Sequence, residues 1–232
     1  MMTDENAGKA YHDLVKAMLL TEVPDDLGTS QSEIREGESL VGKRWPTILR
    51  EFYGEVGRWA MAPGRNSDSL IGPKNVTISN GILRFYVENQ GASSWGVSVD
   101  DLAIENPRIK RIARASTGDM VIDEGLSLDQ FLRMQVLYRA VADAPLVGLM
   151  EYPTHHYLKT VEARLESLPH SRVVFELGPF RRLNGGFVAW RSTEWAAVLL
   201  KENTSAHLFV SVTGPGTQKK FEEEPFLVDF PR

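Results

Sequence analysis

Three carboxylate residues, Asp100, Asp101 and Glu105, lie within one short segment of the sequence, DDLAIE. Two neighbouring carboxyl groups can act as general acid and general base in catalysis. A catalytic pair needs further groups, and no histidine, lysine or nucleophile accompanies these residues within the segment. We therefore expect an acidic loop here rather than a catalytic site.

Two other groups of residues could bind a metal or a charged ligand. His155 and His156 are adjacent, and adjacent positions of a helix point in different directions, so the two rings cannot share a metal ion. The segment RIKRIAR, residues 108–114, could grip phosphates, but the chain around it is net negative and no aromatic residues are interleaved. The sequence thus predicts no metal site and no direct binding of nucleic acid.

The common catalytic motifs are missing from the sequence. It contains no G-x-S-x-G, no H-E-x-x-H, no P-loop and no strand-associated G-x-G-x-x-G. Because the chain has no cysteine, it also lacks thiolate nucleophiles, thiolate metal ligands and disulfides. These absences remove the enzyme classes that such motifs identify, and we expect a protein that is not an enzyme.

Charge is unevenly distributed along the 232-residue chain. The first 146 residues contain 16 Lys and Arg against 21 Asp and Glu, and the remainder carries 10 of each, so the net charge of −5 belongs to the first part. An acidic domain suits a basic protein partner. The start, MMTDENAGKA, lacks the features of a signal peptide, and no later run approaches the length of a membrane span. We expect a cytoplasmic protein that does not bind membranes.

Apolar residues at helical spacing predict helices over residues 10–20 and 45–57, with a polar loop between them. Pro46 suits the first turn of the second helix, and Gly57 is placed to end it. A third helix begins near Ser127, which forms a capping-box pattern with Gln130.

An antiparallel meander follows the second helix. Asn80-Gly81 predicts a tight hairpin, and strict alternation would place Leu83 and Phe85 on an apolar face of the sheet, with Tyr86 on the opposite, mixed face. The predicted strands are residues 76–78, 82–88 and 95–99, with one more extended segment at 107–113.

Ala144-Pro145 marks the end of this part, so we expect one domain over residues 1–146 and a smaller α+β lobe over residues 147–232. In the second lobe the pattern predicts a helix over residues 154–168. Four strands are predicted at residues 173–177, 185–190, 196–202 and 207–212.

The order of these elements over about residues 40–145 resembles the SUKH superfamily. The resemblance rests on the helix LREFYGEVG, the strand FYVENQG, Trp95-Gly96, the acidic pair followed by Asn106-Pro107, and the helix LSLDQFL. Many bacterial members are immunity proteins of polymorphic-toxin systems, and a fungal branch regulates cell-wall synthesis. The family implies no catalytic residues and no cofactor.

The resemblance also implies a fold and a binding surface. The fold is α+β, with helices covering one face of a mostly antiparallel sheet, and Trp95 packs across that sheet while Gly91 and Gly96 permit the turn between two strands. The expected partner-binding residues are Asn89, Gln90, Trp95, Asp100, Asp101 and Glu105, and the five polar ones form one polar, acidic rim.

Such a rim would suit a basic toxin domain, often a nuclease in such systems, which the protein would block in the producing cell without catalysing a reaction. Two alternatives stay open. One is a regulatory or scaffold module that is not linked to a toxin, as in the fungal branch. The other is an enzyme with a site in a cleft between the two lobes.

Overall fold

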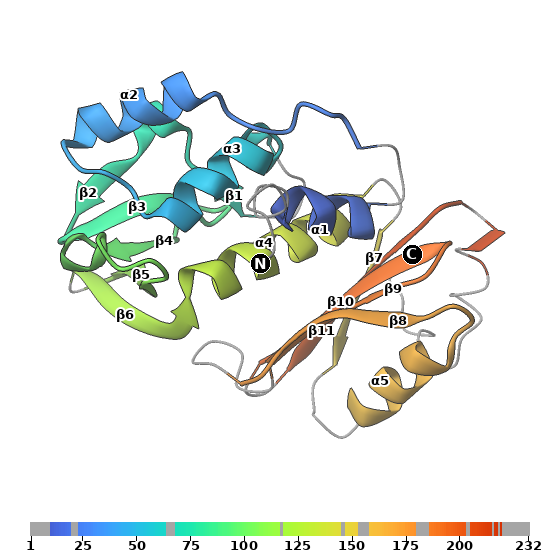
Figure 1. The fold of residues 1–232 in the computed structure, drawn as a ribbon. Helices are drawn as coiled ribbons and strands as arrows, with labels where there is room; N and C mark the ends of the chain where they lie inside the picture. Colours follow the sequence, from blue (N-terminus) through green and yellow to red (C-terminus); the bar gives the residue numbers. More distant parts are fainter. Residues whose placement is uncertain are drawn as a thin grey trace, which may run out of the picture. The chain divides into compact units, whose positions relative to one another are not determined.

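The computed structural model has an α+β fold, in which helices accompany two antiparallel sheets (Figure 1). One compact unit comprises residues 1–14 and 24–139, and the other comprises residues 15–23 and 140–232. The second unit thus includes chain from before residue 146, where the sequence alone places the domain boundary. The structure describes residues 10–19, 23–63, 68–116, 118–144, 147–152, 158–179, 186–202, 205–214, 216, 217 and 219.

Two expected helices form close to where the apolar periodicity places them. They are α1 (Ala10–Met18) and α3 (Thr47–Met61), and Pro46 lies at the N-cap of α3. The buried face of α3 consists of Leu49, Phe52, Tyr53, Val56, Gly57 and Ala60.

Gly57 does not end α3, contrary to the expectation from the sequence, because the helix continues to Met61. The residue is buried against Thr29, and a Cβ atom added at Gly57 would lie 2.3 Å from Thr29 Oγ1. The N–H of Thr29 also donates to the carbonyl oxygen of Tyr53 at 2.8 Å. The close crossing of the segment around Thr29 over α3 therefore explains this glycine.

Directly after Thr29 and Ser30 the chain forms a helix, α2 (Gln31–Val41), where the sequence predicted a loop. Ser30 and Glu33 make a capping box, in which the Glu33 N–H donates to Ser30 Oγ at 3.3 Å and the Ser30 N–H donates to Glu33 Oε2 at 3.0 Å. On the buried face, Gly37 follows Ile34 one turn later, and a Cβ at Gly37 would lie 2.6 Å from the carbonyl oxygen of Pro73. Periodicity misses this helix because a glycine occupies its apolar stripe.

The first unit contains a sheet with strand order β1-β3-β4-β5-β6, in which β2 also pairs with β3 and every pairing is antiparallel. The hairpin at Asn80-Gly81 is confirmed, since both residues have the positive φ that a type I′ turn requires. The strands are β1 (Ser69–Leu70), β2 (Thr77–Ser79), β3 (Ile82–Val87), β4 (Ser93–Ser98), β5 (Arg108–Ala115) and β6 (Gly118–Ser127), and only β1 and β6 were not predicted.

A β-bulge in β3 changes which residues face the core. Arg84 pairs with Gly96 but Tyr86 pairs with Trp95, so Phe85 is the extra residue. Phe85 and Tyr86 therefore point to the same face of the sheet. The strict alternation expected from the sequence was wrong beyond Arg84, because a bulge shifts the register by one residue.

Phe131 on α4 (Leu128–Ala142) packs on this face of the sheet. Its ring centroid lies 5.5 Å from that of Tyr86, 5.9 Å from that of Trp95 and 6.5 Å from that of Phe85, and all four side chains are buried. Gly96, expected in the turn, lies within β4, where a Cβ would fall 2.1 Å from a carbonyl oxygen of β3. The two strands can approach closely only because this residue lacks a side chain.

Helix α4 begins and ends on polar contacts. The predicted capping box is confirmed: the Ser127 N–H donates to Gln130 Oε1 at 3.0 Å, and the Gln130 N–H donates to Ser127 Oγ at 3.4 Å. Near the other end, the buried guanidinium of Arg139 donates to the carbonyl oxygens of Ala60 and Ala62 at the end of α3. A cation at that position also suits the negative end of the helix dipole.

The second unit has its own antiparallel sheet, of order β7-β11-β10-β9-β8, and its own core. The four predicted strands and the predicted helix are confirmed, although residues 154–157 lie outside the described part, and β7 was not predicted. Leu158, Val161 and Leu165 of the helix pack against apolar residues of the sheet. The elements are β7 (Val147–Tyr152), α5 (Leu158–Ser167), β8 (Arg172–Leu177), β9 (Gly186–Arg191), β10 (Trp195–Lys201) and β11 (Ala206–Val212).

Candidate protein-interaction site

The structure separates the predicted binding residues into two groups. Asn89 and Gln90 are exposed in the turn between β3 and β4, whereas Asp100 and Asp101 belong to the short helix η3 (Val99–Asp101) that follows the other end of β4. A strand rises about 3.3 Å per residue, so the six residues of β4 hold the two groups roughly 20 Å apart. The single rim expected from the sequence does not form.

Trp95 lies in the core between these two groups. It is 2% exposed, and its ring packs with Tyr86 and Phe131. The indole of Trp95 therefore lies beneath the surface. Of the predicted binding residues, the five polar ones remain as candidates for contact with a partner.

The acidic loop, residues 99–106, is anchored at both ends. At its start the Val99 N–H donates to the carbonyl oxygen of Gly81 at 2.8 Å. At its end Asn106 Oδ1 accepts from the Asp129 N–H at 3.0 Å, in the first turn of α4. A hydrogen bond from the Ile104 N–H to the carbonyl oxygen of Asp101 closes the loop internally. The loop is thus a shaped element, held by the sheet and by a helix.

A second segment, residues 42–46 between α2 and α3, faces the acidic loop. The carboxylate of Glu38 fixes this segment, because it accepts from the Trp45 N–H at 2.8 Å and lies 3.5 Å from Arg50 Nε. The Lys43 N–H donates to the carbonyl oxygen of Glu38 as well. Trp45 is buried and packs on Tyr53, with ring centroids 5.1 Å apart.

A groove of about 430 Å³ lies between the two segments, lined by residues 43–47 on one side and by Val99, Asp100 and residues 102–105 on the other. Pro46, Leu102 and Ile104 give it apolar surface, and Ile104 is 51% exposed. Asp100 and Glu105 supply carboxylates on one side. An apolar surface bordered by charge is typical of a contact site for another macromolecule.

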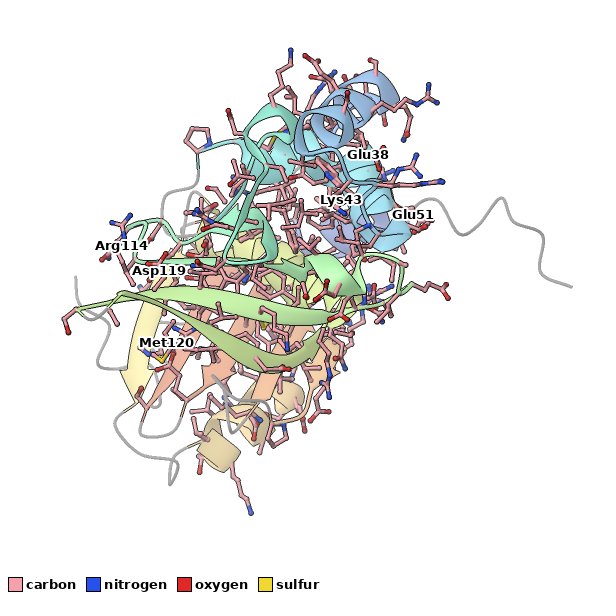
Figure 2. The ribbon with its side chains drawn as sticks, turned by 90° about the vertical axis from the view of Figure 1, so that its left-hand side faces the viewer. Glu38, Lys43, Glu51, Arg114, Asp119 and Met120 are labelled. Atoms are coloured by element: carbon pink, nitrogen blue, oxygen red, sulfur yellow. The ribbon has the colours of Figure 1, made fainter. Side chains whose placement is uncertain are left out.

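Glu51 lies on α3 just beyond the groove, on the side that carries Lys43 and Arg44. Burial raises the pKa of Glu51 above its usual value, and the nearby carboxylate of Glu105 raises that pKa further. Thr47, which lines the groove, lies one helical turn before Glu51, so the two face the same side of α3. Figure 2 shows Glu51 and Lys43 well apart from Arg114 and Asp119, which lie toward the far end of the β5–β6 hairpin.

Two basic residues on the opposite side of the groove, Lys43 and Arg44, were not predicted as site residues. They lie more than fifty residues from the acidic loop in the sequence, and no short motif links the two segments. The basic pair directly before the Trp45-Pro46 helix start is the only sequence signal that could have indicated them.

A second cavity, of about 320 Å³, lies between α1, residues 25–30 and α3. It contains His12 and Glu55, and burial raises the pKa of Glu55. However, Glu55 Oε2 accepts from the backbone N–H groups of Tyr11 at 2.8 Å and His12 at 3.2 Å, so this carboxylate caps the start of α1. We interpret Glu55 as a structural residue rather than a general base.

Two cations of RIKRIAR have partners on β6, and the adjacent histidines lie outside the described residues. Within RIKRIAR, Lys110 pairs with Asp123 at 2.7 Å and Arg111 with the buried Glu124 at 2.6 Å, so these cations are engaged by β6. His155 and His156 lie outside the described residues. Among the residues that the structure describes, no group of three or more histidine or acidic side chains could hold a metal ion, and no helix has the length and apolar character of a membrane span.

Comparisons of the chain with protein families, with curated proteins and with solved structures each returned no match.

Proposed function

We propose that the protein is a SUKH-type immunity protein, which binds a cognate polymorphic toxin in the cytoplasm of the producing cell and blocks it without catalysing a reaction. The observation that carries this proposal is the anchored acidic loop, residues 99–106, beside the groove described above. The loop presents carboxylates on a rigid frame, as a surface for a basic protein would require.

Binding would proceed in two stages. The carboxylates of the first unit, including Asp100 and Glu105, would attract a basic toxin domain and speed its encounter with the protein. The apolar part of the groove, around Ile104 and Leu102, would then be covered and slow dissociation. Blocking follows if the bound loop covers the surface that the toxin uses for its own substrate, which for a nuclease is basic.

The test is to co-express the toxin domain encoded beside this gene with the wild-type protein and with an Asp100→Lys/Asp101→Lys variant. We expect wild type to protect the host and to co-elute with the toxin on gel filtration. We expect the variant to bind the toxin at least about tenfold more weakly, because each reversed charge turns an attraction into a repulsion. Its melting temperature should stay close to that of wild type, since Asp100 is exposed and Asp101 is partly exposed.

Three outcomes are informative. Protection and a complex with wild type alone support the proposal. A lack of protection and of any complex with wild type contradicts it, and recovery of an envelope or metabolic protein in a pull-down would then favour a regulatory module. A variant that unfolds would reassign Asp100 and Asp101 to structure.

A further inference from the structure

The two walls of the groove beside the acidic loop carry opposite charges. Lys43 and Arg44 lie on one wall, and Asp100 and Glu105 lie on the other. All four side chains belong to exposed residues. Among the residues that the structure describes, no hydrogen bond or ion pair engages any of these four charged groups. The groove therefore offers two unpaired cations on its basic wall and two unpaired carboxylates on its acidic wall.

The charged residues just outside the lining do not change the sign of either wall. Arg50 and Glu38 offset each other, since Arg50 Nε lies 3.5 Å from Glu38 Oε1. Glu51 lies beyond the basic wall, which keeps a positive balance from its two cations. Asp101 follows Asp100 and makes the acidic wall more negative.

The acidic wall also carries apolar side chains. Leu102 and Ile104 line the groove, and Ile104 is 51% exposed. A partner that covers this groove must bring carboxylates to the basic wall and an apolar group to Ile104. The acidic loop of this chain has the same two properties, because Glu105 directly follows the exposed Ile104. The loop of a second copy therefore has the chemistry that the groove requires.

Two-fold symmetry satisfies both walls at once. An isologous interface uses the same surface patch on both subunits, so that each contact occurs twice. A two-fold axis near Ile104 would turn the acidic wall of each copy toward the basic wall of the other. The two Ile104 side chains would then lie together near the axis, away from water, with the paired charges around them.

We propose that the groove is a dimer interface, in which the acidic loop of each copy lies in the groove of a second copy of this chain. Asp100 and Glu105 face Lys43 and Arg44 of the other copy, and Ile104 packs at the centre. This inference goes beyond the proposed function and does not depend on it.

The oligomeric state of the full-length chain tests the proposal. Sedimentation equilibrium would cover concentrations from about 1 μM to about 1 mM, the range in which weak complexes dissociate. The net charge of −5 makes two copies repel each other at a distance, but salt at about 0.15 M screens this repulsion beyond about 8 Å. We expect a reversible monomer–dimer equilibrium at that ionic strength. A wild-type chain that stays monomeric throughout overturns the proposal.

Two charge-reversal variants show whether the groove forms the interface. Lys43→Glu/Arg44→Glu makes both walls negative, and Asp100→Lys/Glu105→Lys makes both walls positive. Each variant alone should dimerise at least about tenfold more weakly than wild type, because the facing walls now repel each other. Mixed in equal amounts, the two variants should form a one-to-one dimer, since each wall again meets its opposite. Variants that dimerise like wild type, or a mixture that stays monomeric, contradict the proposal.

Net charge alone cannot explain recovery in that mixture. Each reversal changes the formal charge of −5 by two, so the two variants carry −9 and −1 and both remain negative. The matched control, Arg35→Glu/Lys159→Glu, also carries −9 but reverses two exposed cations outside the groove. It should dimerise as wild type does, and a loss equal to that of the groove variant would show that the effect is not local.

An apolar pair of variants provides a test in which no charge changes. Ile104 is 51% exposed in the groove, and Ile78 is 40% exposed on β2. We expect Ile104→Ser to weaken dimerisation several-fold, because it removes the apolar group that the second copy covers. Ile78→Ser should leave dimerisation unchanged, and equal effects of the two substitutions would place the interface elsewhere.

The dimer and the proposed toxin complex use the same groove, so the second copy and the toxin would compete for it. If wild type binds the toxin but stays monomeric, the dimer is wrong and the proposed function stands. If wild type dimerises through the groove but neither binds nor protects against the toxin, the proposed function fails and the dimer stands.

Discussion

The ring of Phe131 on α4 lies against the indole of Trp95 on β4, with 5.9 Å between the two ring centroids. These side chains are 1% and 2% exposed, so the contact joins a helix to the middle of the sheet within the core. The fold of the first unit depends on this contact, because Tyr86 and Phe85 pack on the same Phe131 ring.

Replacing either ring by alanine should therefore unfold the first unit readily. We expect Trp95→Ala and Phe131→Ala each to lower the free energy of unfolding by roughly 3–5 kcal/mol, the usual loss for a buried aromatic residue. Urea denaturation followed by circular dichroism would measure the loss, with Phe131→Leu as a milder control. A loss below about 1 kcal/mol for Trp95→Ala would mean that its indole lies at the surface instead.

The glycines of α3 offer a matched pair for a test of packing. A Cβ at Gly57 would lie 2.3 Å from Thr29 Oγ1, whereas a Cβ at Gly54 would meet only the end of the Gln31 side chain, at 3.3 Å. Both residues lie inside the helix, where alanine is favoured over glycine by up to about 1 kcal/mol. We expect Gly54→Ala to be neutral or stabilising and Gly57→Ala to destabilise by about 1–3 kcal/mol in thermal and urea unfolding. Equal gains for both variants would contradict the close crossing at Gly57.

Helix α2 should depend on its capping box. We expect Ser30→Ala to lower the free energy of unfolding by about 1 kcal/mol, while Ser39→Ala, in the exposed part of the same helix, should have little effect. Hydrogen bonds from the side chain and backbone of Ser30 lower the pKa of Glu33. A lowered pKa in the folded state adds stability above the usual pKa of glutamate, and this stability is lost as the pH falls through the lowered value.

Carboxyl NMR titration of Glu33 provides the readout for that pH effect. The pKa of Glu33 should rise toward its usual value in Ser30→Ala, and the stability difference between the variant and wild type should shrink as the solution is made more acidic. An unchanged Glu33 pKa would show that Ser30 does not bond to this carboxylate.

The carboxylates of Glu51 and Glu105 predict the opposite pH dependence. Burial and then Glu105 raise the pKa of Glu51, so the folded protein holds that proton more tightly than the unfolded chain does. Stability from this group is present below the usual pKa of glutamate and is lost as the pH rises through the raised value. Glu105→Gln should lower the pKa of Glu51 and make the protein slightly more stable than wild type at neutral pH, with no difference well below pH 4. Glu36→Gln, whose carboxylate pairs with Lys74, is the control and should leave the pKa of Glu51 unchanged.

Local signals in the sequence were sufficient for several elements of the fold. The Asn80-Gly81 hairpin, the capping box of Ser127 and the strands of the second unit depend on neighbouring residues, and the structure confirms them. Gly57 shows what a single sequence does not reveal. A glycine that ends a helix and a glycine that lets another segment cross closely cannot be told apart by residue type alone. The bulge at Phe85 depends on the register with β4, which the pattern of β3 alone does not contain.

The candidate site was predicted only in part. The acidic loop forms as predicted. However, the predicted strand at residues 95–99 lies between Asn89 and Asp100, so the sequence already implied that these two residues lie at opposite ends of that strand and not on one rim. Lys43 and Arg44 complete the groove from the segment before α3, and only the folded chain brings that segment to the loop.

Anchoring at both ends gives the acidic loop a further property. The hydrogen bond to Gly81 holds the first residue of the loop, and the hydrogen bond to the start of α4 holds the last. Residues 103–105, which are exposed, take part in neither of these two anchoring hydrogen bonds. Those three positions can therefore be exchanged at little cost to folding. A scaffold of this kind could be retargeted to a new partner by substitutions confined to one short stretch of chain.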